Sequence, residues 1–259
     1  MKAFFLGLLV VIPLVGSLAE QAGSYRDFVA PDTEQMDLLG PVKNIRTVSY
    51  DLEAGKPQIS GEESETFDPQ GYLLEEHSLD HDSKEESRTR YSYDAAGNLT
   101  EEIELKGSRT MTKKVRLFPE RQRSEKTIVS VGRTVTLEES KYDSFKKESE
   151  GTNYQENGQV DYRYKARRDK AGKEIEVTFS DASGKPTSIT TSEWDARGFI
   201  IKETTDDRVE KYLVLTTYEY PQVDLHGNWT EQLSNVTVRT KGRKDMSWKD
   251  RSVRTVEYH

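Results

Sequence analysis

The residues in this chain that are most able to do chemistry are its carboxylates, which stand in several adjacent pairs. Two carboxyl groups held about 5 Å or roughly 6.5–9.5 Å apart can hydrolyse a glycosidic bond. The pairs are Glu75-Glu76, Glu85-Glu86, Glu101-Glu102 and Asp206-Asp207. Adjacent side chains of a β-strand point to opposite faces, so the two members of a pair do not meet. With 46 acidic residues in the chain, surface charge is the better interpretation of these pairs than a hydrolase site.

Histidine offers little for nucleophilic or metal chemistry here. The chain has four histidines, His77, His81, His226 and His259, and no cysteine. His77 and His81 stand near Asp80 and Asp82 and could be drawn as a metal site. The pair runs from a predicted strand into a turn, however, so a solvated turn is the better interpretation. The chain also lacks a phosphate-binding loop and a dinucleotide-binding motif. We therefore predict no catalytic residue, no metal, no cofactor and no enzymatic activity.

Aromatic side chains are the strongest candidates for binding, because they can stack on sugar rings or anchor a protein partner. The candidate ligand-binding residues are Trp194, Trp229 and Trp248. Trp194 and Trp229 flank predicted turns, which also favours a place in the core. Trp248 follows the charged stretch 241–245, so we expect it near an exposed loop.

The elements that must position these residues are predicted to be β-strands. Only 33% of the residues are hydrophobic and 32% are charged, which indicates a thin sheet with one apolar face and one charged face. Residues 160–166, 174–179 and 212–220 alternate between apolar and polar side chains with a period of two. Such recurring aromatic alternation is not typical of disordered chains.

Repeated tight turns separate these strands. In an Asp-x-x-Gly turn the carboxylate accepts a backbone N–H two residues on, and glycine adopts a positive φ without steric cost. A further copy, 154–158, keeps the glycine but lacks the aspartate, and 142–146 and 118–122 look like more degenerate copies. The predicted turn residues are Asp68, Gly71, Asp94, Gly97, Gly158, Asp169, Gly172, Asp181, Gly184, Asp195, Gly198, Asp224 and Gly227.

The spacing of these turns predicts the topology. Successive glycines from 158 to 198 lie 12–14 residues apart, which is enough for one strand and one turn. We therefore predict an all-β fold, an antiparallel meander of repeated hairpins that forms a curved, open or partly closed single sheet.

The N-terminus has the pattern of a secretory signal. Lys2 precedes the apolar run 3–15, and Ser17-Leu18-Ala19 provides small residues for cleavage before Glu20. We therefore predict a signal peptide at 1–19, an N-terminal segment with a possible short helix at 20–40, and a β-repeat domain at 41–259. The helix is expected within 32–39, as a lid or plug at one end of the sheet.

Charge and cysteine content limit the location and the partners. The formal net charge of −8 disfavours nucleic acid as a partner. Without cysteine there is no disulfide and no lipoprotein anchor, and no segment after the signal is apolar enough to be an integral membrane span. We expect an exported, soluble protein of the periplasm or the medium, with an open question as to its oligomeric state.

Several of these turns resemble the tyrosine-aspartate (YD) repeats of the Rhs family, especially those of small secreted bacterial proteins. The resemblance rests on 67–73, 93–99, 194–198 and 224–230, and it extends over most of residues 39–259. In large members of the family such repeats form a shell around a toxin, but this chain has far fewer repeats. The resemblance implies a curved antiparallel sheet and contact with carbohydrate or protein at a cell envelope.

Three functions from different classes remain open at this point. The first is a non-enzymatic binding module for a glycan or an envelope protein. The second is a periplasmic carrier of lipid or apolar peptide in a partial barrel, which the low apolar content disfavours. The third is a carboxylate-dependent glycan hydrolase, which the absence of a catalytic motif disfavours.

Overall fold

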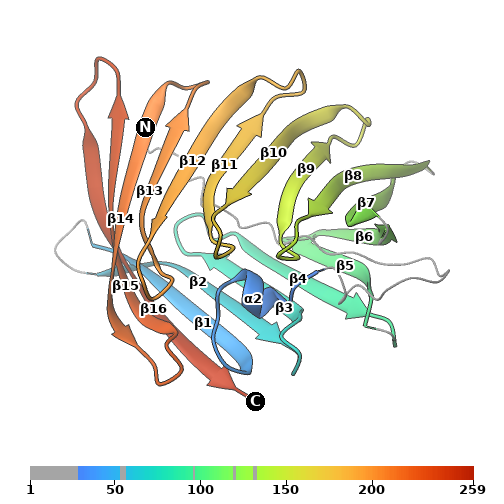
Figure 1. Ribbon diagram of the computed structural model, residues 1–259, viewed down its shortest axis with the longest axis horizontal. Coiled ribbons are helices and arrows are strands. Elements are labelled where there is room, and N and C mark those ends of the chain that lie inside the picture. The colour runs from blue at the N-terminus through green and yellow to red at the C-terminus, as the bar shows by residue number, and fades with distance from the viewer. Residues whose placement is uncertain (1–28, 53–56, 96, 119–120, 131–132) are drawn as a thin grey trace.

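The strands of this protein form one antiparallel meander that closes on itself. The computed structural model describes residues 29–52, 57–95, 97–118, 121–130 and 133–259, so the predicted signal peptide lies outside the described residues. Each strand pairs with its neighbours in sequence order, and β1 also pairs with β16, which completes a closed barrel (Figure 1). The described residues form one short helix and sixteen strands: α2 (Asp32–Gln35), β1 (Val42–Asp51), β2 (Gln58–Phe67), β3 (Leu73–Asp80), β4 (Glu86–Tyr93), β5 (Leu99–Lys106), β6 (Arg109–Phe118), β7 (Arg123–Ser130), β8 (Arg133–Tyr142), β9 (Glu148–Tyr154), β10 (Val160–Arg168), β11 (Glu174–Ser180), β12 (Pro186–Trp194), β13 (Ile200–Asp207), β14 (Tyr212–Val223), β15 (Trp229–Thr240) and β16 (Met246–Tyr258).

The prediction of an open or partly closed sheet is therefore wrong, although the all-β antiparallel meander is present. β1 and β16 pair from Val42↔Tyr258 to Asp51↔Asp250, along almost the whole of β1. Closure satisfies the backbone N–H and C=O groups that two free edges would expose. Local alternation cannot reveal this pairing, because its partners lie more than 190 residues apart in the chain.

The Asp-x-x-Gly turns lie at both ends of the barrel. Those at 68–71, 94–97, 169–172, 195–198 and 224–227 join an even-numbered strand to the next odd-numbered one, and we call this end the helix-side rim. The turns at 155–158 and 181–184 lie at the opposite rim. The structural repeat is thus a two-strand hairpin of 26 residues in its regular copies, such as 143 to 169 and 169 to 195.

Each turn closes in the same way, as the first copy illustrates. The Gly71 N–H donates to the Asp68 carbonyl at 2.9 Å, and the Asp68 carboxylate accepts the N–H groups of Gln70 and Tyr72. Glycine takes φ +87° at this position. The degenerate copy at 143–146 keeps the aspartate bonds but holds Lys146 at φ +57°, a conformation that is less favourable for a side chain with a Cβ.

A regular hydrogen bond links neighbouring hairpins near the helix-side rim. A side chain near the end of an even strand donates to the carbonyl group twenty residues earlier, at the start of the preceding odd strand. The bonds measure 2.8 Å and are Tyr93 to Leu73, Arg168 to Glu148, Trp194 to Glu174 and Tyr220 to Ile200. This contact gives Tyr93, Trp194 and Tyr220 a structural role in the repeat, and Arg168 takes the same role before the turn at 169–172.

The core lies where the N-terminal segment meets the strands β1 to β8. Val29 and Leu38 pack against Ile45, Phe67 and Leu73, which are fully or almost fully buried. Residues 29–40, which we call the plug, lie across the helix-side mouth of the barrel, and Figure 1 shows α2 among the strand ends. The N–H groups of Ala30 and Thr33 donate to the carbonyls of Lys146 and Gly71, so the plug is held by turns from two different parts of the wall.

The outward face of the barrel carries ion pairs between neighbouring strands. Examples are Arg46–Glu62 at 2.5 Å, Arg88–Glu75 at 2.6 Å and Lys165–Glu150 at 2.9 Å. The inward face also carries charged side chains, as described below. The expectation of one apolar face and one charged face is thus not met, because charge is distributed over both. Among the described residues, no helix is long and apolar enough to cross a membrane.

Candidate functional site

The inner wall of β10 to β16 is the part of the protein best suited to bind a ligand. Residues directly opposite one another in the ladder point to the same face of the sheet. Glu65 and Phe67 on β2 serve as the inward-facing starting points. Following the paired residues from strand to strand, in either direction around the barrel, identifies the same inward-facing side chains. Three neighbouring rows of inward side chains run across the strands. Each row lies two residues further along every strand than the row before it, so neighbouring rows are roughly 6.6 Å apart.

The first row, which we call the aromatic row, contains three half-buried aromatic side chains. The ring centroids of Tyr164 and Phe179 lie 6.1 Å apart, and the ring of Tyr162, two residues before Tyr164 on β10, lies 6.0 Å from that of Phe179. Tyr164 fits because its partner is Gly151, where an added Cβ would lie 2.3 Å from the tyrosine ring. The row runs Tyr212, Asp207, Ser188, Phe179, Tyr164 and Gly151.

The second row, the central row, consists of smaller side chains. It extends over about six strand spacings, or roughly 29 Å. Thr190 and Thr205 bond to each other at 2.9 Å within it. The row runs Met246, Val238, Val214, Thr205, Thr190, Val177 and Ala166.

The third row, the tryptophan row, begins with Trp248. It continues with Val236, Thr216, Glu203 and Ser192. The Trp248 indole N–H donates to the Asp250 carboxylate at 3.1 Å, which fixes the orientation of the ring. Trp248 is half-buried on the inner face of β16, two residues after the strand begins. It therefore follows the loop predicted from the sequence but faces into the barrel.

Carboxylates accompany the aromatic groups of this wall. The Tyr218 hydroxyl donates to Glu203, and Tyr212 bonds to Asp207. Burial, followed by the charge of Glu203, raises the pKa of Tyr218 above its usual range. Burial also raises the pKa of Tyr220 to about 12, so these hydroxyls stay protonated and donate to Glu203 and to the Ile200 carbonyl. The wall thus combines flat apolar faces with hydroxyl and carboxylate groups.

The three candidate tryptophans are not brought together. The Trp194 indole donates to the Glu174 carbonyl, and the Lys173 ammonium lies 4.7 Å from its ring centroid. The Arg254 guanidinium stacks on Trp229 at 3.7 Å. Trp229 lies seven residues along β15 from Val236, the partner of Trp248, which is roughly 23 Å. Only Trp248 lies beside the aromatic and central rows, whereas the other two stand near the helix-side rim.

The remaining wall, from β3 to β9, is filled by a buried ion network. The Lys126 ammonium is 3% exposed and lies 3.0 Å from Glu102 and 3.3 Å from Glu138. Lys113 also contacts Glu102, at 2.5 Å. Burial alone would lower the pKa of Lys126, but the carboxylates of Glu102 and Glu138 outweigh it and raise the pKa. This network is closed by its own partners and leaves little for a ligand.

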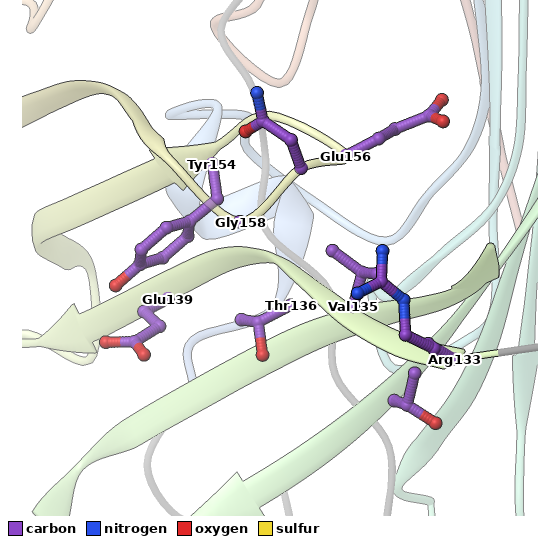
Figure 2. A pocket seen from close by; sticks show the side chains of 9 residues that line it. Arg133, Val135, Thr136, Glu139, Tyr154, Glu156 and Gly158 are labelled. Carbon is purple, nitrogen blue, oxygen red and sulfur yellow. The ribbon is translucent and has the colours of Figure 1, made fainter. Parts of the chain in front are cut away.

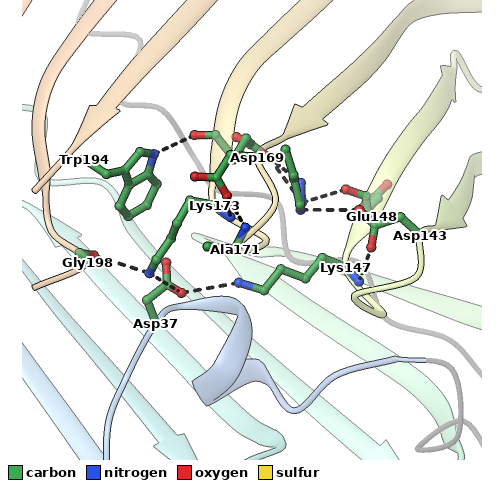
Figure 3. A network of polar contacts seen from close by, with 11 residues as sticks. Asp37, Asp143, Lys147, Glu148, Asp169, Ala171, Lys173, Trp194 and Gly198 are labelled. Atoms are coloured by element: carbon green, nitrogen blue, oxygen red, sulfur yellow. Dashed lines mark hydrogen bonds and ion pairs between the residues drawn. The ribbon is translucent and has the colours of Figure 1, made fainter. Parts of the chain in front are cut away.

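The plug contributes one further network at the helix-side mouth. Figure 3 shows the Asp37 carboxylate between the ammonium groups of Lys173 and Lys147, at 2.8 and 3.4 Å. Lys173 also lies over Trp194 and donates to the Gly198 carbonyl at 3.4 Å. These contacts tie the plug to the turns after β8, β10 and β12.

A shallow hollow of about 390 Å³ lies at the opposite rim, between β8 and the turn after β9. Figure 2 shows Arg133, Glu139, Tyr154 and Glu156 around it. The residues are polar and do not converge on one point. Within the described ranges, no three His, Cys, Asp or Glu side chains are grouped so as to hold a metal ion. His77 instead contacts Glu86 at 2.9 Å, and His81 contacts Glu62 at 3.4 Å.

Sequence reasoning counts the tyrosines in general among the side chains that can stack on a sugar, but it does not single out Tyr164, Phe179, Tyr212 or Tyr218. Their alternation with polar residues is visible in the sequence and predicts their strands. This alternation does not distinguish a sheet face that packs in the core from one that lines a cavity, because in either case the apolar side chains recur at every second residue.

Comparison with known proteins assigns the chain to no family, since no family model and no curated protein matches it. A porin-like protein from Bacteroides uniformis aligns over 85% of this chain and 99% of its own, with a TM-score of 0.45 and 11% identity. A chain in the crystal structure of TcdB2-TccC3-TEV and one in the Photorhabdus luminescens Tc holotoxin pore align at TM-scores of 0.21. They share 11% and 10% identity, and each alignment covers 74% of this chain but only 13% of the Tc chain.

Proposed function

We propose that this protein is a non-enzymatic binding protein that holds a glycan chain along the inner wall of β10 to β16. The observation that carries the proposal is the row of half-buried aromatic side chains facing the inside of the barrel, with Trp248 two rows away. Aromatic groups that solvent reaches on a concave wall are available for stacking in a way that core aromatics are not.

The polar groups of the same wall support a glycan rather than a lipid. Sugar rings offer apolar faces for stacking and hydroxyl groups that both donate and accept hydrogen bonds. Glu203 and Asp207 can accept such bonds, and Ser188 and Ser192 can do either. Carboxylates on the wall and the ion network of β3 to β9 disfavour the alternative of a lipid carrier, because apolar chains do not compensate buried charge.

The outward ion pairs support a barrel that lies in water. A barrel that spans a membrane presents an apolar band about 25 Å tall to the lipid. Here Arg88, Lys165 and Arg167 pair with glutamates on neighbouring strands of the outer face. Together with the predicted signal peptide, this favours an exported protein of the periplasm or the medium.

Binding to a glycan array, followed by titration of the best glycan, tests this proposal. The Trp248→Ala and Tyr164→Ala variants should each weaken binding about fivefold, because each removes a stacking contact of about 1 kcal/mol. Tyr50→Ala is the matched control, since Tyr50 lies on the neighbouring strand β1 but faces outward, beneath Arg251. Its binding should equal that of the unaltered protein.

Two results would contradict the proposal. One is that no glycan binds while an envelope protein or lipid does. The other is that Trp248→Ala and Tyr50→Ala affect glycan binding to the same extent, which would place the glycan outside the barrel. A hydrolase is distinguished in the same experiment, because it would shorten the bound glycan over time.

A further inference from the structure

The two ends of the plug are held by different kinds of contact. At its C-terminal end, the Asp37 carboxylate pairs with Lys147 and Lys173, and Asn228 exchanges two hydrogen bonds with the backbone of Leu39 at 2.7 and 2.8 Å. At its N-terminal end, the N–H groups of Ala30 and Thr33 donate to the carbonyls of Lys146 and Gly71, and the Tyr72 hydroxyl donates to the Val29 carbonyl. The same end also buries Asp32, whose carboxylate accepts the N–H of Leu73 at 2.7 Å. The first set comprises ion pairs and neutral bonds, whereas the second places a carboxylate in the core.

The Asp32 side chain lies in an unfavourable place for a negative charge. It is 0% exposed, and its Oδ1 has no hydrogen-bond partner on any other described residue. The titratable groups that face it belong to β2, β3, β4, β8 and the turn after β2, and all of them are acids: Glu65, Glu76, Tyr91, Tyr142 and Asp68. On α2 itself the neighbouring charged residue is Glu34, which is also acidic.

The plug nevertheless fits closely against the wall at this point. Thr33 lies so near Gly71 that an added Cβ on the glycine would stand 2.2 Å from the threonine hydroxyl. Ala30 is only 2% exposed. The N-terminal part of the plug therefore has a single docked position, which it either occupies or leaves.

We propose that residues 29–35 are a hinged plug that closes the helix-side mouth of the barrel when the Asp32 carboxyl is protonated and leaves it when Asp32 is charged. The hinge is the segment 37–40, which stays fixed through Asp37 and Asn228. Release opens a second entrance to the lumen at the end where Trp194 and Trp229 lie.

The direction of the pH dependence follows from the burial of Asp32. Burial is the largest cause that raises the pKa of Asp32 from 3.8 to about 7; the charges of Glu76 and Asp68 add to it, and the Leu73 N–H opposes it. Docking is therefore strongest below pH 4 and weakens as the pH rises to about 7. A difference of about three pH units corresponds to a docking equilibrium that falls by up to roughly a thousandfold.

Cysteine accessibility can test this directly, because the chain has no cysteine of its own. Ala30→Cys reports on the released part and Leu38→Cys, at a position 8% exposed, reports on the hinge. Glu34→Cys, at an exposed position on the same segment, supplies the reference rate, since thiol reactivity itself rises with pH. Labelling rates with a thiol reagent are measured from pH 5 to 9 and divided by this reference.

We expect the normalised rate for Ala30→Cys to rise about 100-fold with a midpoint near pH 7, and that for Leu38→Cys to stay nearly constant. Adding Asp32→Asn, which keeps the oxygen that accepts from Leu73, should hold the Ala30→Cys rate low at every pH. Glu76→Gln removes a facing charge and should lower the midpoint.

The proposal is overturned by a flat Ala30→Cys profile, by the same rise in the Asp32→Asn protein, or by Leu38→Cys rising in parallel with Ala30→Cys. Should Asp32→Asn not fold, the Glu76→Gln variant decides the matter, because an unchanged midpoint would also overturn it. Circular dichroism at each pH verifies that the barrel itself stays folded.

Discussion

The two halves of the barrel wall use the same strands and turns for opposite purposes. From β3 to β9 the inward side chains are buried and paired with one another, as Lys126 is with Glu102 and Glu138. From β10 to β16 Tyr164, Phe179, Tyr212 and Trp248 are half-buried, although Thr190 and Val236 on the same wall are buried, and the aromatic rings stand beside hydroxyl and carboxylate groups. One half therefore fills its interior with its own contacts, while the other is the half on which we place the proposed glycan.

This difference indicates that the repeat specifies the fold of the barrel but not the side chains that face its interior. Tyr93 and Trp194 make the same bond to the hairpin before them, one in each half. The inward residues at mid-strand are not part of this repeat and vary from hairpin to hairpin. A repeated frame can thus carry one half with a buried ion network and another half with inward aromatic side chains, without a change of fold.

The largest expected effect is on the buried network. Lys126→Met leaves the carboxylates of Glu102 and Glu138 without their shared cation, which we expect to cost about 3–5 kcal/mol of the free energy of unfolding. Lys165→Met on the outer face, which breaks an exposed pair with Glu150, should cost at most about 1 kcal/mol. Urea unfolding of both variants measures the difference. Equal losses would mean that the two faces are equally solvated.

A smaller effect is expected from matched valines on the two halves. Val115→Ala on β6 removes a side chain that is 5% exposed and should cost about 2 kcal/mol of unfolding free energy. Val214→Ala on β14 removes a half-buried side chain and should cost less than about 1 kcal/mol. Urea unfolding tests this as well. A larger loss for Val214→Ala would show that the β10–β16 wall is packed and has no room for a glycan.

The smallest effect concerns the pH dependence of stability. Burial, followed by the charge of Glu138, raises the pKa of Glu148 well above its usual range. A carboxyl with a raised pKa in the native state lowers stability as the pH rises above its unfolded value. Glu148→Gln should therefore raise the free energy of unfolding at pH 9 by about 1 kcal/mol relative to pH 5.

The control for this measurement is Glu150→Gln. Its side chain lies on the outer face, and hydrogen bonds from Lys165 and Lys141 lower the pKa of Glu150. A lowered pKa has the opposite sign, so this variant should gain no stability at pH 9. If Glu148→Gln and Glu150→Gln respond alike, the burial of the β3–β9 network is not what sets the pKa of Glu148.

Much of the local structure can be predicted from the sequence because it is determined over short distances. The bonds that Asp68 makes to Gln70 and Tyr72 lie within five residues, so the turn is visible as a motif. The Gly158 and Gly184 turns have the same local pattern as the others, although they lie at the opposite rim. Short motifs do not contain the information that separates the two rims, because it depends on the direction of the strands they join.

The binding wall is harder to predict, for a related reason. The sequence separates Trp248 from Trp194 and Trp229 by their positions relative to the turns, but it does not give their neighbours, which come from other hairpins, such as Lys173 over Trp194. Tyr164 depends on Gly151, its partner on the neighbouring strand β9, for the space it occupies. Partners of this kind follow from the register of the sheet, which alternation alone does not fix.

By itself, the sequence determined an all-β chain of hairpins, the positions of its turns and a short helix before the first strand. Alternation and turn chemistry act within a few residues, so one chain suffices to predict them. Only the tertiary structure decided that the sheet closes, that Trp248 faces the lumen while Tyr50 faces solvent, and that Asp32 is buried among acids. Those features depend on β1 meeting β16 and on the plug meeting distant turns, contacts between residues that are separated by much of the chain.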